Sequence, residues 1–317
     1  MTVYRCEVDL DAIEALDVHV HIEQGSDGHT SLPPRLADAA QAYFRSDGAT
    51  PDVSGVAAYY RSLNMAAVIF TVDAGTALEH PPISSEQIAD EAADQADVLI
   101  PFGSVDPHRG DAAIDQARSL VHDHGVRGFK FHPTVQGFDP SDEQYRPLWS
   151  AISDLGVPAI VHTGQTGIGA GLPGGAGMRL RYSDPMLLDD VAADLPELSL
   201  ILAHPSVPWQ DAAISMATHK KNVAIDLSGW SPKYFPAQLV RAAGSFLQDK
   251  VLFGSDFPML TPERWLRDFA TLPISDEIRP KILLANAGRV LGLLPEQNTN
   301  SNNTDSNNTD LNNEENR

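Results

Sequence analysis

Short apolar runs recur along the chain from residue 17 to residue 256. Each has about the length of a strand, is rich in Val, Ile, Leu and Phe, and is bounded by Gly, Pro, Asp or Asn. Nearly continuous apolar runs are typical of strands that are covered on both faces, as in parallel sheets. We therefore predict eight buried strands, at 17–21, 66–72, 98–105, 126–132, 157–163, 198–204, 222–228 and 251–256.

Segments with helical features lie between these runs. Residues 141–155 begin with Ser141 and have Gln144 three positions later, which is a capping-box pattern, and they end at Gly156. The other predicted helices are 84–97, 111–124, 185–194, 209–220, 236–248, 262–271 and 276–293. Strands that alternate with helices form βαβ units and a parallel sheet.

Eight such units predict an α/β fold, a (β/α)8 TIM barrel of the metal-dependent hydrolase type. A doubly wound open sheet is the alternative, but no predicted strand is followed by a G-x-G-x-x-G turn. The connections 22–50 and 164–184 are longer than the rest and follow strands one and five. Active sites of barrels lie at this end of the strands, so we expect these two long loops to cover a substrate.

The last segment, 296–317, differs from the rest of the chain. It is polar, contains one apolar residue, Leu311, and repeats SNNTD. Such a segment buries too little apolar surface to offset the entropy of ordering, so we expect a disordered tail. Residues 1–295 are then a single catalytic barrel.

Charge narrows the classes of partner. The chain has 22 Lys and Arg against 43 Asp and Glu, a net charge of −21, typical of a solvated surface or of adaptation to high salt. Such acidity argues against binding to nucleic acid or to an anionic membrane. A lone cysteine, Cys6, excludes an internal disulfide, and we expect neither a signal peptide nor an apolar membrane span. We expect a cytoplasmic protein that binds a small molecule, and homo-oligomerisation stays open.

Polar residues end several of the predicted strands. His19 and His21 are two positions apart and so face the same side of strand one. His162, His204 and Asp256 end strands five, six and eight. A buried carboxylate needs a cation, and neutral imidazoles offer lone pairs to one. Four histidines and an aspartate at the same end of a barrel therefore predict a metal site.

This set and its strand order resemble the amidohydrolase superfamily, and more narrowly its amidohydrolase-related branch, which includes aminocarboxymuconate semialdehyde decarboxylase. The resemblance covers about residues 15–294. It implies that His19, His21, His162 and Asp256 bind one divalent metal ion, usually Zn²⁺, with Mn²⁺ as the alternative. It also implies that His204 acts beside the metal as an acid/base or electrostatic partner, and that Asp256 shuttles a proton. The stretches GAGLPGGAG and LSGWSPKYFP look similar to aryl β-ketoacyl-CoA hydrolases.

Four further residues are candidates for substrate binding. Lys130 and His132 share one side of strand four. Some amidohydrolases carry a carboxylated Lys here that bridges two metals, but this branch is mononuclear, so we interpret Lys130 as a contact to a substrate anion or as a structural ion pair. His132 is alternatively a packed residue at a strand end. Arg179 and Trp230 lie in loops that follow strands five and seven, where a lid and ordinary loop packing are the alternatives.

These features predict a metal-dependent hydrolase that activates a water molecule to attack a carbonyl of a small anionic, aromatic or acyl substrate, including a β-keto acyl bond. The alternative is a nonoxidative, metal-dependent decarboxylase of a small, aromatic carboxylic acid. Fold and metal ligands are common to both reactions and do not separate them.

Overall fold

The computed structural model describes residues 3–44 and 50–295. The expected tail, 296–317, lies outside the described residues. Eight parallel strands pair in the orders β1-β2-β3 and β4-β5-β6-β7-β8. They are β1 Ala15–His21, β2 Met65–Phe70, β3 Leu99–Pro101, β4 Phe129–Phe131, β5 Ala159–His162, β6 Leu200–Ala203, β7 Val223–Asp226 and β8 Val251–Leu252.

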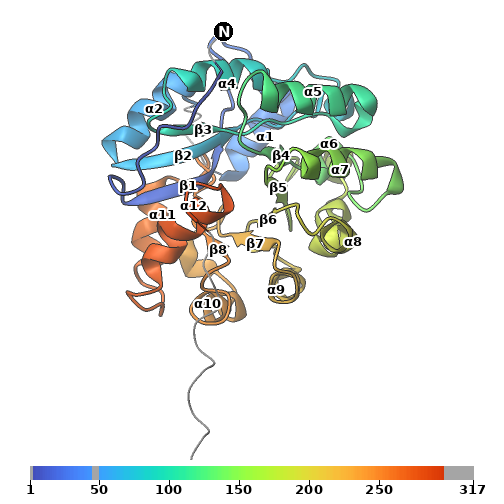
Figure 1. Cartoon of the computed structure of the whole chain (residues 1–317). Coiled ribbons are helices and arrows are strands. Elements are labelled where there is room, and N and C mark those ends of the chain that lie inside the picture. The colour runs from blue at the N-terminus through green and yellow to red at the C-terminus, as the bar shows by residue number, and fades with distance from the viewer. Residues whose placement is uncertain (1–2, 45–49, 296–317) are drawn as a thin grey trace, which may run out of the picture.

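Two single bridges close these strands into a ring. Gly103 pairs with Phe129 between β3 and β4, and Val20 pairs with Phe257, which follows β8. The N–H of Val18 also donates to the carbonyl of Phe253 at 3.0 Å. The eight-stranded barrel is therefore confirmed, and the open sheet is excluded (Figure 1).

Helices surround the strands (Figure 1). Neither α1 nor α2, which both lie between β1 and β2, was among the predicted helices. The predicted helix 276–293 is a π-helical turn, Lys281–Ala285, followed by a short α-helix. The α-helices are α1 Pro34–Phe44, α2 Val53–Ser62, α3 Gly75–Leu78, α4 Ser85–Ala93, α5 Asp111–His122, α6 Pro133–Gln136, α7 Arg146–Asp154, α8 Asp189–Asp194, α9 Gln210–His219, α10 Ala237–Ala243, α11 Pro262–Phe269 and α12 Asn286–Val290.

The buried side chains form two layers. Those inside the barrel include Phe70, Ile160 and Ile201, and α12 contributes Ala287 to the same cluster. The larger layer lies between the strands and the helices and contains Tyr60, Trp149 and Trp265, among others. Nearly continuous apolar strands are explained by this arrangement, because both faces of each strand are covered.

A register shift in β1 determines which way its histidines point. The pairing with β2 is irregular between Asp17 and Val20. Before the shift Leu16 and Val18 lie in the interior, whereas after it Val20 packs in the outer layer. His19 and His21 therefore face the interior, next to Phe70. Such bulges re-aim side chains near active sites.

Asp17 holds this bulge in place. Its Oδ1 accepts the backbone N–H groups of His19 at 3.0 Å and of Ser255 at 2.9 Å. Its Oδ2 accepts from the hydroxyl of Tyr60 at 2.7 Å. One fully buried carboxylate thus ties β1 to the segment after β8 and to helix α2.

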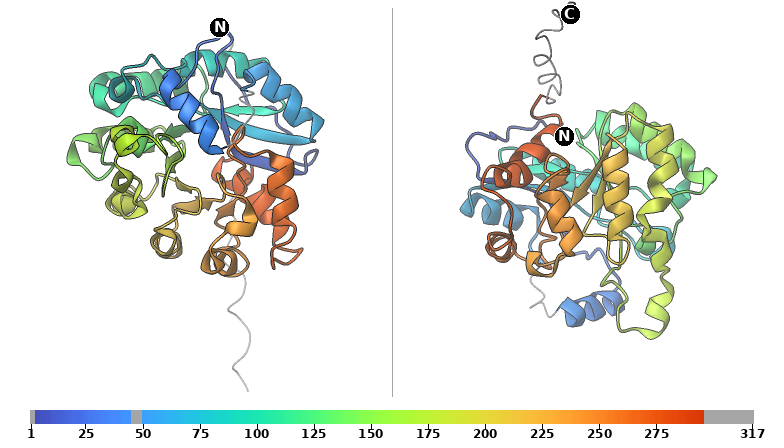
Figure 2. Two further views of the ribbon diagram at one scale, coloured as in Figure 1. Left: turned by 180° about the vertical axis from the view of Figure 1, so that it is seen from behind. Right: turned by 90° about the horizontal axis from the view of Figure 1, so that it is seen from below.

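Both long connections predicted from the sequence are present. Helix α1 lies in the one after β1, and 3-10 turns lie in the one after β5. Figure 2 shows the two segments side by side at one end of the barrel. Within the described residues, no helix combines the length and apolar character needed to cross a membrane.

Candidate active site

Three metal-ligating atoms converge at the carboxyl ends of the strands. Nε2 of His19 lies 3.2 Å from Nε2 of His21 and 3.2 Å from Oδ1 of Asp256, and Nε2 of His21 lies 3.3 Å from the same oxygen. Ligands at about 2.0–2.1 Å from one tetrahedral ion are about 3.3 Å apart. The triangle of His19, His21 and Asp256 therefore fits a single metal ion.

Each histidine of this triangle is held through its other nitrogen. Nδ1 of His19 lies 2.5 Å from Oδ2 of Asp226, at the end of β7, and Nδ1 of His21 lies 3.2 Å from Oε1 of Glu23. A carboxylate on Nδ1 fixes the tautomer in which Nε2 carries a free lone pair, and it raises the basicity of the imidazole. The hydrogen-bond pattern around the two histidines is thus the one that metal-ligating histidines usually have.

His162 and His204 form a second pair beside the triangle. Nε2 of His204 lies 2.9 Å from Nδ1 of His162, and Nδ1 of His204 lies 2.9 Å from Oγ of Ser228. The same hydroxyl lies 2.9 Å from Nδ1 of His19. Ser228 therefore connects the triangle to the second pair.

His162 was predicted to be the fourth metal ligand. The structure does not place it in the group of three donors, and that role stays a prediction. Its Nε2 is one of three buried side-chain nitrogen or oxygen atoms in the described residues that lack a hydrogen-bond partner. A buried, unpartnered imidazole nitrogen is costly, and a ligand or a cation at this position would satisfy it.

Burial and mutual contacts shift the pKa values of the triangle and of the residues around it. Burial acts to raise the pKa of Asp256, but the hydrogen bond from His21 and the charge of His19 outweigh it and hold that pKa below its usual range. Burial lowers the pKa values of His19 and His204. Burial also raises the pKa of Asp226 to about 6. Burial acts to lower the pKa of His21, but its contacts with Asp256 and Glu23 outweigh burial and raise it. The ionised Asp256 and the neutral His19 and His204 are the forms that favour binding of a cation.

Two of these residues have an unusual backbone. His204 and Asp256 both adopt a φ of 72°, in the left-handed region that side chains other than glycine rarely enter. Such conformations cost free energy and cluster at functional sites. Both residues were predicted to be catalytic, and both line the cavity described next.

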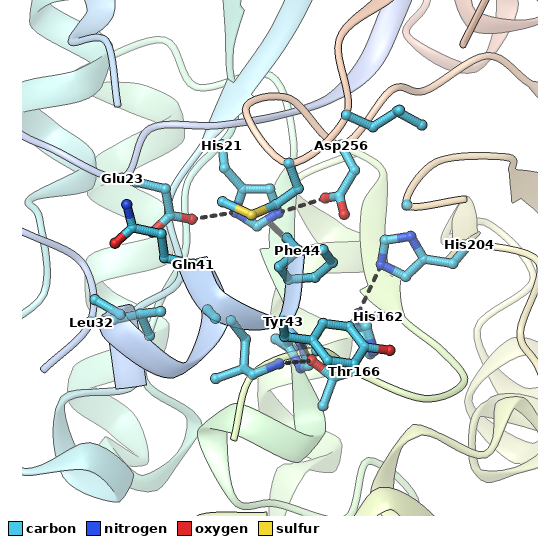
Figure 3. Close-up of a pocket in the computed structure, with 18 of the residues that line it drawn as sticks. His21, Glu23, Leu32, Gln41, Tyr43, Phe44, His162, Thr166, His204 and Asp256 are labelled. Atoms are coloured by element: carbon cyan, nitrogen blue, oxygen red, sulfur yellow. Dashed lines mark hydrogen bonds and ion pairs between the residues drawn. The ribbon is translucent and has the colours of Figure 1, made fainter. Parts of the chain in front are cut away.

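A cavity of about 570 Å³ opens onto the triangle. Of the predicted substrate-binding residues, His132 and Trp230 line it. The ring of His132 stacks on that of His162, with 3.7 Å between centroids and 10° between planes. Figure 3 shows His21, Asp256, His162 and His204 around the cavity.

Lys130 and Arg179 are not among the described residues that line this cavity. Lys130 is fully buried, with Nζ 2.9 Å from Nε2 of His19 and 4.8 Å from the ring centre of Phe70. Burial lowers its pKa to about 8. Arg179 is exposed, and its carbonyl accepts from the hydroxyl of Thr134. The structure thus places Lys130 against the donor triangle and Arg179 outside the cavity.

Sequence reasoning missed the residues that support the triangle: Asp17, Glu23, Asp226 and Ser228. Asp226 carried the same signal as the other candidates, since it is a polar residue at the end of an apolar strand. Glu23 follows the His19 and His21 pair at the same spacing of two. Asp17 had no signal, because a bulge cannot be recognised from residue alternation.

Comparison with known proteins identifies the family. A family profile described as Amidohydrolase matches residues 16–293, which is most of the chain. The chain therefore belongs to the amidohydrolase family and is an enzyme of that superfamily, as the resemblance implied.

The chain is also similar to individual known proteins. The chain is 23% identical over 284 residues to a gamma-resorcylate decarboxylase from Rhizobium sp. (strain MTP-10005), covering 76% of this chain and 85% of that one. An uncharacterized TIM-barrel protein from Bordetella bronchiseptica is 23% identical, with a TM-score of 0.70 and coverage of 88% and 99%. A dihydroxybenzoic acid decarboxylase from Polaromonas sp. JS666, solved with bound manganese and the inhibitor 2-nitroresorcinol, is 18% identical, with a TM-score of 0.63 and coverage of 89% and 97%.

Proposed function

We propose that this protein is a nonoxidative, metal-dependent decarboxylase of an aromatic carboxylic acid. The observation that carries the proposal is the triangle of His19, His21 and Asp256 at the polar end of a cavity that His204 also lines. Relatives whose names identify them as decarboxylases of resorcylate and dihydroxybenzoic acid favour this reaction over hydrolysis, which the sequence had favoured.

The same three residues are proposed to hold one divalent ion, with His162 as a further ligand. Zn²⁺ and Mn²⁺ are both candidates, and the relative solved with manganese supports the second. When bound, the ion supplies positive charge that neutralises the substrate's anionic oxygens and holds them in place. Glu23 and Asp226 orient His21 and His19 for this purpose.

His204 is the proposed proton donor. In decarboxylation the bond between the ring and the carboxylate breaks, CO₂ leaves, and the ring carbon that keeps the electron pair takes up one proton. His204 lines the cavity and is connected through Ser228 to Asp226. A substrate carboxylate beside His204 favours its imidazolium form, from which the proton is delivered.

Asp256 is better suited to binding the metal than to donating a proton. Its hydrogen bond with His21 and the neighbouring imidazoles keep its pKa low and its carboxylate ionised. Within the cavity, Trp230 and His132 offer flat surfaces on which an aromatic ring can stack. These roles agree with a flat aromatic acid whose carboxylate points toward the triangle.

Product analysis tests the proposal. Protein loaded with Mn²⁺ or Zn²⁺ would be incubated with 2,6-dihydroxybenzoate and a panel of other hydroxybenzoates in D₂O. We expect release of CO₂ and one deuterium at the ring carbon that lost it. If metal-loaded protein released no CO₂ from any acid of the panel, but hydrolysed an ester or a β-keto acyl compound, decarboxylation would be the wrong reaction.

A further inference from the structure

The cavity has two chemically different zones. Its polar zone is the group of His21, His132, His162, His204 and Asp256. A second group comes from α1 and the residues just before it, from the loop after β5 and from the segment after β8. The polar residues Asp38, Gln41 and Thr166 of these segments also line the cavity, but most of the group is apolar, and we call its apolar members the apolar zone. It consists of Leu32, Ala40, Phe44, Ile168, Met259 and Leu260. Figure 3 labels Leu32 and Phe44 of this zone among the side chains that line the cavity.

Helix α1 is seated firmly over the apolar zone. A Cβ added to Gly167, in the loop after β5, would lie 2.3 Å from Cζ of Phe44 and 2.9 Å from Cδ1 of Tyr43. The backbone of that loop therefore packs directly against both aromatic rings. Leu36 and Ala40 of the same helix are buried. Helix α1 thus covers the apolar zone from one side.

The apolar zone carries little charge that could bind an anion. Arg264 is the one Lys or Arg among the cavity-lining residues that the structure describes, and it is exposed. The acidic residues Glu23 and Asp38 also line the cavity. A second carboxylate or a phosphate on the substrate would find few partners here, whereas an uncharged apolar group would be buried favourably.

The size of the cavity also favours a substrate that is larger than a single-ring acid. Its volume of about 570 Å³ lies in the range of about 300–1,000 Å³ that is typical of pockets for drug-sized ligands. A single-ring acid such as 2,6-dihydroxybenzoate has about eleven non-hydrogen atoms, fewer than a drug-sized ligand, so it would leave part of the cavity empty.

We propose that the natural substrate is an elongated acid. Its carboxylate and ring lie in the polar zone, and an uncharged apolar tail extends from the ring under α1. The orientation of the head group rests on the proposed function, but the tail zone rests on the separate contacts between α1, the loop after β5 and the segment after β8.

A ligand series tests the tail zone without turnover. Manganese-loaded protein would be titrated calorimetrically with benzoate and with its 4-ethyl, 4-butyl and 4-hexyl derivatives. We expect Kd to fall about two- to fourfold for each added methylene until the zone is filled, because each buried CH₂ gains transfer free energy. Values for benzoate and 4-butylbenzoate within twofold of each other, or weaker binding of the longer acid, would overturn the proposal.

Two variants of α1 locate the tail. Ala40→Phe fills the apolar zone, and we expect it to weaken 4-hexylbenzoate at least tenfold more than benzoate. Ala42→Phe places the same side chain on an exposed part of α1 that does not line the cavity, and it should leave the series unchanged. If Ala40→Phe does not fold, as judged by circular dichroism, Ile168→Trp makes the same comparison. Equal losses for both acids would contradict a tail under α1.

The outcomes for the two proposals are distinguishable. If Kd falls along the ligand series but no CO₂ is released, the result would support the tail zone and contradict decarboxylation. Release of CO₂ from 2,6-dihydroxybenzoate with a flat series would support decarboxylation and contradict the elongated substrate.

Discussion

Nδ1 of His19 lies 2.5 Å from Oδ2 of Asp226, and both side chains are fully buried. This contact joins β1 to β7 across the barrel interior, and Oγ of Ser228 reinforces it with a 2.8 Å hydrogen bond to the same carboxylate oxygen. Because the carboxylate accepts the Nδ1 proton, the lone pair of His19 is left on Nε2, the nitrogen that faces His21 and Asp256.

Asp226→Asn should therefore weaken metal binding while leaving the fold intact. An asparagine that turns its NH₂ toward Nδ1 forces the imidazole proton onto Nε2, which then has no lone pair for a metal. We expect a ten- to hundredfold loss of affinity for Mn²⁺ or Zn²⁺, measured by competition with a chelating dye. Asp211→Asn, on the exposed side of α9, is the matched control. A Kd within twofold of the wild type would show that Asp226 does not orient the ligand.

His204→Asn should separate metal binding from catalysis. His204 lines the cavity but is not one of the three clustered donors, so metal content by elemental analysis should stay at the wild-type level. Loss of the proposed proton donor should lower turnover by about 10²–10⁴-fold. His122→Asn, exposed on α5, controls for the substitution itself. Full activity in His204→Asn would remove His204 from the mechanism, and lost metal would make it a ligand instead.

Much of the fold and of the site could be predicted from the sequence, for a physical reason. Apolar runs that end in His or Asp mark buried strands whose carboxyl ends carry polar groups, and this pattern led to His19, His21 and Asp256. Their convergence follows from barrel closure, because parallel strands bring all their carboxyl ends to one edge.

Other features depend on tertiary contacts that leave no periodic signal. Helix α1 lies in a segment read as a loop, and its Phe44 packs against the backbone at Gly167, which is distant in the sequence. The bulge after Asp17 is stabilised by backbone groups from Ser255, far away in the chain. Arg179 was expected near the cavity because its loop follows β5, but that loop turns the residue to the exposed side.

The buried Asp17 should make the stability of the protein depend on pH. Burial raises its pKa to about 7, above the unfolded value of about 3.9. The folded state then binds more protons than the unfolded state between these values, so stability falls as pH rises from about 4 to about 7. Asp17→Asn lacks this ionisation, yet its side-chain oxygen can still accept the N–H groups of His19 and Ser255.

When the pH rises from 5 to 8, the free energy of unfolding of Asp17→Asn should increase by about 2–3 kcal/mol relative to that of the wild type. Urea denaturation of both proteins at the two pH values, in the presence of a chelator, measures this difference. Asp154→Asn, an exposed carboxylate on α7, should show a much smaller change. A difference between Asp17→Asn and the wild type that is the same at both pH values would contradict the buried ionisation.

Gly254, just after β8, packs so closely against the residues that support the triangle that there is no room for a side chain. A Cβ there would lie 2.2 Å from Oδ1 of Asp226 and 2.9 Å from Cβ of both His19 and Ser228. Gly254→Ala must therefore shift β1 or β7, and overpacking of this kind costs about 1–3 kcal/mol of stability. Because the displaced groups hold His19, the variant should also lose metal affinity at temperatures where it is still folded.

Thermal melts and metal titrations of Gly254→Ala test both effects. Gly244→Ala, whose added Cβ would meet no atom nearer than 3.3 Å, is the control that should retain metal binding. A Gly254→Ala protein with wild-type metal affinity would show that the triangle tolerates movement of its supports.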